Sequence, residues 1–163
     1  MSVAEILRLA HALAGVVFVS GMVGHWIVTG FIRRADSLGA MQVLVRTARP
    51  FGMLLTVGGI TLTLTGVATA IALGRPMLGP LQGGHVDWMF VSVLLMLPLF
   101  INLAAVYPRK GRVIQVALNH AAAQGALTPA LVAAWNDPIL RAARTYELVA
   151  VTIVLILMIA KPF

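Results

Sequence analysis

The sequence predicts an all-α membrane protein, a four-transmembrane-helix bundle with a short cytoplasmic helical hairpin between helices 3 and 4. Three observations lead to this fold class. The 163 residues are 60% hydrophobic and only 10% charged, whereas a soluble domain carries about 25% charged residues. Four segments approach the roughly 20 apolar residues that a helix needs to cross the hydrocarbon layer. Most basic residues lie between these segments, as expected where loop charges orient a membrane protein.

The four spans are expected at residues 6–31, 51–73, 86–107 and 138–160, within a single domain of residues 1–163. The first span is expected to be retained and not cleaved as a signal peptide. Acidic and basic residues precede its long apolar run, which exceeds the roughly 7–15 residues of a signal core.

The second span, "FGMLLTVGGITLTLTG", is rich in glycine and threonine. Small residues let membrane helices approach closely, and hydroxyl groups can bond across helices or back to their own carbonyls. We interpret this pattern as helix packing. The alternative is a space for a flat ring system against the backbone.

The fourth span has a short apolar core, and its start is set by the motif "NDP". Asp137 is the expected N-cap and Pro138 the first helical residue. On that start, Arg141 and Arg144 lie in interfacial turns and extend to the lipid headgroups. An ion pair between Glu147 and Arg144 is the expected contact one turn further on.

The segment from 109 to 136 predicts the helical hairpin. "RVIQVALNHAAAQGAL" has loosely amphipathic spacing and ends near Gly125. "TPALVAAW" starts a second helix, with Thr128 as its cap and Pro129 after it.

The basic residues predict the orientation. Nine lie on the side of the predicted loops after spans 1 and 3, against three on the other side. The positive-inside rule therefore places both termini on the non-cytoplasmic side of a bacterial-type inner membrane. The net charge of +7 comes without a Gly-rich phosphate loop, so we expect lipid and not nucleic acid as the partner. The nine residues are Arg33, Arg34, Arg46, Arg49, Arg109, Lys110, Arg112, Arg141 and Arg144.

Two histidines lie in the first span. His11 and His25 are fourteen residues apart, which at about 100° per residue places them on nearly one helix face, about 21 Å apart. Gly15, Phe18 and Met22 fall on the same stripe. Ionisable side chains inside a membrane usually face the protein interior, and neutral histidine is a common haem ligand between facing helices.

The candidate ligands are therefore His11, His85 and His25. His85 opens the third span at the level of His11, so the pair His11 and His85 is the preferred metal site. His120 lies in the hairpin at the level of His25 and is expected to be solvated. The alternative for a membrane histidine is a hydrogen bond to a carbonyl or a threonine of a neighbouring helix. His25 beside Trp26 also suits an interfacial anchor, and His85 an exposed loop.

Several stretches resemble a known group: "LRLAHALAGVVFVSG", "RPFGMLLTVGGITLTLTG", "GGHVDWMFVSVLL", "YPRKGRV" and "LILMIAKPF". Together they are similar to an uncharacterised family of predicted four-span bacterial integral membrane proteins. More loosely, they resemble the copper-resistance membrane domain and the haem-containing protoporphyrinogen oxidases of the HemJ type. The latter resemblance implies haem binding at His11. It does not carry the oxidase reaction, because Asp87 stands where those proteins have lysine in a His-x-Lys motif.

These observations favour a small membrane protein that binds haem b and serves electron transfer, with quinone or a larger membrane redox complex as the partner. The sequence leaves open whether the protein is an enzyme and favours a non-enzymatic role, since it has no HExxH, GxSxG or carboxylate cluster. One alternative is a non-catalytic accessory subunit that uses its Gly/Thr faces for contact. A second is a copper-handling or small transport protein. The absence of cysteine excludes disulfides and thiolate metal sites.

Overall fold

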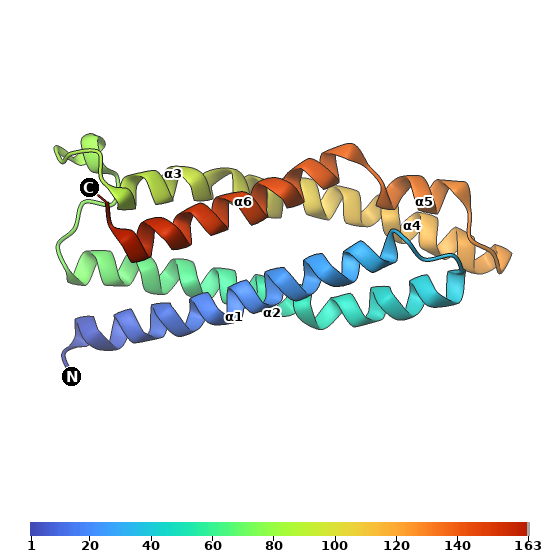
Figure 1. Cartoon of the computed structure of the whole chain (residues 1–163), viewed down its shortest axis with the longest axis horizontal. Coiled ribbons are helices and arrows are strands. Elements are labelled where there is room, and N and C mark those ends of the chain that lie inside the picture. The colour runs from blue at the N-terminus through green and yellow to red at the C-terminus, as the bar shows by residue number, and fades with distance from the viewer. Residues whose placement is uncertain (163) are drawn as a thin grey trace. The chain divides into compact units, whose positions relative to one another are not determined.

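The structure is a computed structural model, and it describes residues 1–162. These residues form helices and no strand, and four helical stretches are long and apolar enough to cross a membrane. The predicted fold class is therefore confirmed (Figure 1). The elements are α1 (Val3–Ile32), α2 (Leu38–Ala72), the 3₁₀ turn η1 (Gly79–Gln82), α3 (Trp88–Ile101), the π-helical segment η2 (Asn102–Val106), α4 (Tyr107–Gln124), α5 (Pro129–Trp135) and α6 (Pro138–Ala160).

Two helices extend beyond the spans predicted from the sequence. The second span was expected from residue 51, but α2 begins at Leu38 and continues through Pro50. A proline inside a helix removes one backbone hydrogen bond and usually ends it, yet here the helix extends on both sides. At 1.5 Å per residue, its 35 residues span about 52 Å, more than the roughly 30 Å of hydrocarbon.

The third span was expected to end at residue 107, but α3 continues through η2 into α4 without a loop. Pro98 lies inside α3, one turn before η2, where its missing N–H interrupts the helical ladder. The predicted hairpin is thus made by α4, an extension of the third span, and the short α5, which packs against it. Gly125 ends α4 in the left-handed conformation, as is usual for a C-terminal glycine.

The predicted helix starts are confirmed by their caps. The Asp137 carboxylate accepts hydrogen bonds from Ile139 N and Leu140 N at the start of α6. The Thr128 side chain accepts from Leu131 N in α5. Each cap satisfies backbone N–H groups that have no partner within the helix.

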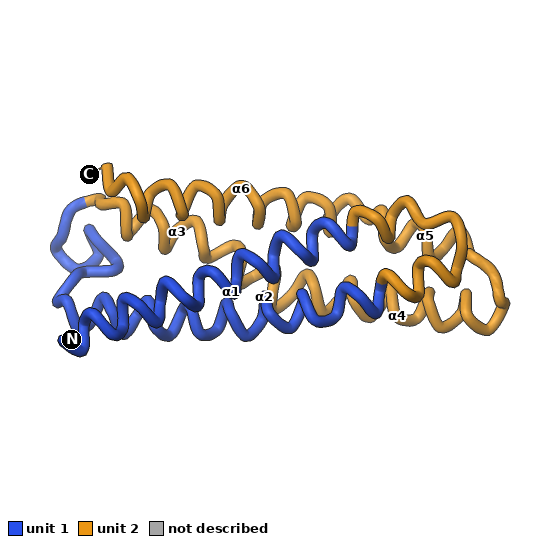
Figure 2. The backbone as a smooth tube through the Cα atoms, turned by 60° about the horizontal axis from the view of Figure 1, so that its bottom comes forward, with its two compact units in different colours: residues 1–29, 45–85 blue, residues 30–44, 86–163 orange. Residues whose placement is uncertain are grey.

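The chain forms two compact units, coloured separately in Figure 2. Unit 1 consists of residues 1–29 and 45–85, and unit 2 of residues 30–44 and the described residues from 86 onward. Whether the two units form the single domain predicted for residues 1–163 depends on how they pack together, so the single domain stays a prediction.

In unit 1, α1 and α2 run antiparallel with unusually close backbones (Figure 1). A Cβ added at Gly21 would lie 2.5 Å from the backbone nitrogen of Leu55. A Cβ at Gly58 would lie 2.8 Å from the backbone of Phe18, which is itself buried. Glycines on each helix therefore admit the other helix, and the packing interpretation is confirmed. The alternative was a space for a flat ring system against the backbone of α2. At Gly58 there is no such space, because Phe18 occupies that surface.

Four threonines of α2 are satisfied within their own helix. Their hydroxyl groups donate to the carbonyl four residues earlier, at 2.6–2.9 Å. Such back-bonding hides the hydroxyl group from the lipid at little cost. The bonds are Thr56 to Gly52, Thr63 to Gly59, Thr65 to Thr61 and Thr69 to Thr65.

In unit 2, α3 lies beside α6 along its length (Figure 1). The Tyr146 hydroxyl group on α6 donates to Leu95 O on α3 at 2.8 Å. Beyond the C-terminal end of α6, the Lys161 ammonium group lies 5.9 Å from the centre of the Trp88 ring. These contacts, together with apolar packing, hold the third and fourth spans together.

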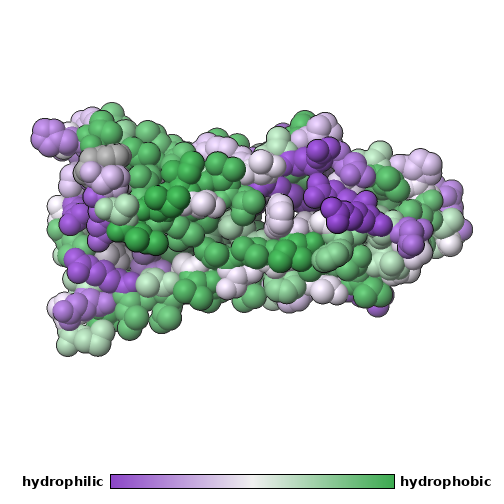
Figure 3. All heavy atoms as spheres, viewed as in Figure 1, coloured by the Kyte–Doolittle hydropathy of each residue, from purple (hydrophilic) through white to green (hydrophobic). Residues whose placement is uncertain are grey.

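The outer surface of the helices is apolar. Large side chains on every long helix are more than half exposed, among them Leu64 at 66%, Ile71 at 72% and Ile156 at 58%. Figure 3 shows apolar residues over the long helices and hydrophilic residues gathered where α6 begins. Water does not tolerate contiguous apolar surface of this extent, whereas lipid chains do. The molecule is an integral membrane protein.

Candidate functional site

The first candidate site is the histidine pair of α1, which lies against α2 in unit 1. The His11 Nδ1 atom is 3.0 Å from Leu62 O and 3.3 Å from Thr65 Oγ1. The carbonyl can only accept, so Nδ1 carries the proton and donates to it. The Thr65 hydroxyl proton is directed to Thr61 O at 2.7 Å. In the neutral imidazole, the lone pair is therefore on Nε2.

A glycine of α2 faces each of these histidines. A Cβ added at Gly66 would lie 2.9 Å from His11 Cε1, and one at Gly52 would lie 3.8 Å from His25 Cδ2. The two glycines are fourteen residues apart, as are the two histidines. The predicted histidine stripe thus faces α2, where glycine leaves room for an imidazole ring.

The other two histidines lie elsewhere. His85 is exposed in the segment between η1 and α3, and His120 is exposed on α4. The polar partners of His11 in the described part of the chain are Leu62 and Thr65, so nothing there joins it to His85. Residues 1–162 also contain no group of three or more His, Asp or Glu that could hold a metal ion. Among the candidate ligands, His11 has a ring orientation that is set by its bonds to Leu62 O and Thr65 Oγ1.

The second candidate site lies in unit 2, where α6 passes η2 and the start of α4. The Tyr107 hydroxyl group donates to Glu147 Oε2 at 2.7 Å. Glu147 and Arg144 are only 7% and 9% exposed. Because charged residues within a membrane are costly, such a buried pair indicates function or a specific structural role. The segment η2, which immediately precedes Tyr107, is π-helical, and such segments are frequent at functional sites.

Arg144 is buried beside an aromatic residue, so the prediction that it extends to the headgroups was wrong. Its guanidinium carbon lies 5.7 Å from the centre of the Trp135 ring, a distance that allows cation–π attraction. The predicted ion pair was also wrong, since Glu147 bonds to Tyr107 and no ion pair within 4 Å joins it to Arg144 in residues 1–162. Arg141, one turn earlier, is exposed as expected.

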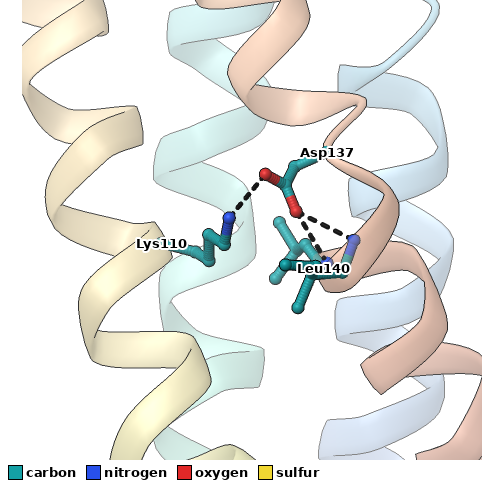
Figure 4. A network of polar contacts seen from close by, with 4 residues as sticks. Lys110, Asp137 and Leu140 are labelled. Carbon is teal, nitrogen blue, oxygen red and sulfur yellow. Dashed lines mark hydrogen bonds and ion pairs between the residues drawn. The ribbon is translucent and has the colours of Figure 1, made fainter.

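An ion pair closes the polar end of unit 2. Lys110 Nζ lies 2.6 Å from Asp137 Oδ2, while Asp137 Oδ1 accepts from the first N–H groups of α6 (Figure 4). One carboxylate thus links α4 to the start of α6. A charge-assisted bond with this geometry fixes the position of the start of α6, and with it the positions of Arg144 and Glu147 further along the helix.

Comparison with known protein families identifies the family of this chain. The family model described as predicted integral membrane protein, DUF2269, matches residues 5–162. The chain belongs to the DUF2269 family. No curated protein and no solved structure matches it.

This membership confirms the predicted relation to a family of integral membrane proteins. No match supports the looser resemblances to the copper-resistance domain or to the HemJ-type oxidases, which stay predictions. The sequence missed the cluster around Arg144 and Glu147 in this DUF2269 protein. The available signal is the pair of opposite charges, Arg144 and Glu147, inside the fourth span.

Proposed function

We propose that this DUF2269 protein binds b-type haem in the bacterial inner membrane, with His11 as an axial ligand, and serves electron transfer. The observation that carries the proposal is the bond from His11 Nδ1 to Leu62 O. Metal-bound histidines almost always donate their other ring N–H to a carbonyl or carboxylate, which sets the tautomer and the ring orientation. Nε2 is then the basic atom that a haem iron would take.

The position of His11 supports the same proposal. The ring is partly buried within an apolar helix pair, where Gly66 leaves it room. Iron binds a histidine through an unprotonated ring nitrogen, and in the described geometry that atom is Nε2. Haem would supply the one-electron chemistry, and this chain would supply the ligand, its orientation and the low dielectric.

The remaining ligands follow from the sequence. His85 is the candidate for the opposite axial position because it opens the segment leading to the third span, and His25 is the candidate for a second site. The exposed position of His85 means that it would have to turn inward to bind. With both termini on the non-cytoplasmic side, the site at His11 would lie toward that side and could serve quinone or a larger redox complex.

The test is the reduced-minus-oxidised absorption spectrum of the protein purified from a membrane fraction. We expect a haem α band in the wild type and its loss in His11→Ala, with the band kept in the matched control His120→Ala. A pyridine haemochrome assay of the wild type gives the stoichiometry without relying on any variant. Wild-type protein that expresses in a haem-replete host and contains no haem would refute the proposal. His11 would then serve only to join α1 to α2.

A further inference from the structure

The buried cluster of unit 2 contains hydrogen-bond donors with no acceptor. Arg144 Nε, Arg144 Nη1 and Trp135 Nε1 are buried and have no partner in residues 1–162. Both side chains are more than nine-tenths buried, with exposures of 9% and 6%. Buried donors are nearly always satisfied, and each one left unpaired costs about 1–3 kcal/mol, more where it is charged. Three such atoms on two touching side chains indicate a missing acceptor.

The guanidinium group of Arg144 has no paired carboxylate in residues 1–162. No ion pair within 4 Å joins it to an acidic residue there, and the Glu147 carboxylate is engaged by the Tyr107 hydroxyl group. The Asp137 carboxylate is paired with Lys110. Arg144 is therefore a buried cation without a partner of opposite charge, which is strongly unfavourable.

We infer that this cluster binds a monoanionic oxyanion, the phosphodiester of a membrane phospholipid. A phosphodiester carries one negative charge, which would pair with the Arg144 guanidinium group. Its unesterified oxygens are strong acceptors for guanidinium and indole N–H groups.

The position of the cluster fits a headgroup phosphate. Arg144 is six residues after Pro138, so it lies about 9 Å along α6 from the start of the helix. That start carries the Lys110–Asp137 pair, and hydrophilic residues gather there (Figure 3). Tryptophan is enriched at the level of the headgroups, so a phosphate that binds beside Trp135 would reach Arg144 without the arginine side chain turning outward. Inorganic phosphate offers the same chemistry from the aqueous side. The inference does not depend on haem binding.

The test measures ligand-dependent thermal stability of the delipidated protein in a neutral maltoside detergent. The probes are dihexanoyl phosphatidylglycerol, dihexanoylglycerol (which lacks the phosphate) and inorganic phosphate. We expect the phospholipid to raise Tm and the glyceride to leave it unchanged. In Trp135→Phe, which keeps the ring and removes one donor, the phospholipid should bind roughly tenfold more weakly.

Arg144→Gln should abolish the shift, whereas the exposed Arg141→Gln, one turn earlier, should keep it within about twofold. If Arg144→Gln does not fold, Trp135→Phe decides alone. A Tm shift of equal size with inorganic phosphate, sensitive to both cluster variants, would assign the oxyanion site to free phosphate and overturn the lipid source. A phospholipid response equal in wild type, Trp135→Phe and Arg144→Gln, or no response at all, would overturn the site itself.

Discussion

Replacing Gly21 with alanine tests the close approach of α1 and α2. The added Cβ would lie 2.5 Å from the Leu55 backbone nitrogen and 2.9 Å from the carbonyl carbon of Leu54. Ordinary contact begins at about 3.4 Å, so the helices would have to separate locally by about 0.9 Å. The obstacle is backbone, which cannot rotate away as a side chain could.

The cost follows from the weaker packing along the interface between the two helices. A gap of about 0.5–1 Å forfeits a quarter to a half of the dispersion energy between each pair of atoms across it, and overpacking a close-fitting site usually costs about 1–3 kcal/mol. The higher helix propensity of alanine offsets up to about 1 kcal/mol of this loss, because glycine is the poorer helix former. We therefore expect Gly21→Ala to lower the free energy of unfolding by about 1–2 kcal/mol.

Reversible unfolding in mixed micelles with increasing SDS, followed by circular dichroism, measures this difference. The matched control is Gly111→Ala in α4, where an added Cβ meets nothing within 4 Å. There the helix propensity acts alone, and we expect stability to be unchanged or up to about 1 kcal/mol higher. If Gly21→Ala proves as stable as the wild type, the two backbones do not approach this closely, and glycine does not set the spacing of the helices.

Three further changes probe the polar contacts. Tyr107→Phe leaves a buried carboxylate oxygen of Glu147 without its donor, so the free energy of unfolding should fall by about 1–3 kcal/mol in the same SDS assay. In the control Tyr146→Phe, the lost hydrogen bond is to a neutral carbonyl, and the free energy of unfolding should fall less. Asp137→Ala removes both the ion pair and the cap of α6, and its Tm should therefore fall further than that of Lys110→Ala; equal falls would show that the cap contributes nothing. Gly66→Ala should displace the facing imidazole and remove its Nδ1–H signal from the spectrum of ¹⁵N-histidine-labelled protein, and an unchanged signal would contradict the close contact.

The helices and their starts could be predicted from the sequence, since they depend on local physics. Apolar length indicates a span, and Asp137 and Thr128 followed by proline are start signals whose effect does not depend on the rest of the fold. The beginning of α2 could not be predicted in this way. Pro50 normally ends a helix, and only the surrounding structure decides whether the chain bends there or continues.

The cluster in unit 2 could not be predicted because it depends on tertiary contacts. Arg144 occupies a position from which a long side chain can reach the headgroups or turn inward. The choice depends on Trp135 on α5, across the break between α5 and α6, and on Tyr107 at the start of α4, which is distant from Arg144 in sequence. Local spacing favoured a pair between Arg144 and Glu147, but the tyrosine hydroxyl group reaches the carboxylate instead.

The fourteen-residue spacing of His11 and His25 has a physical reason beyond ligand chemistry. Residues fourteen apart return to nearly the same helix face, so a stripe of larger side chains on α1 needs small residues at the same spacing on an antiparallel partner. Gly66 and Gly52 meet this need. Packing against α2 therefore limits where an imidazole can lie on α1. Packing alone gives no reason for an Nε2 atom of His11 that has a lone pair available for a metal ion. Haem content and stability should therefore both be measured for His11→Ala. If His11 is a ligand, the variant should contain no haem even where α1 and α2 remain packed together.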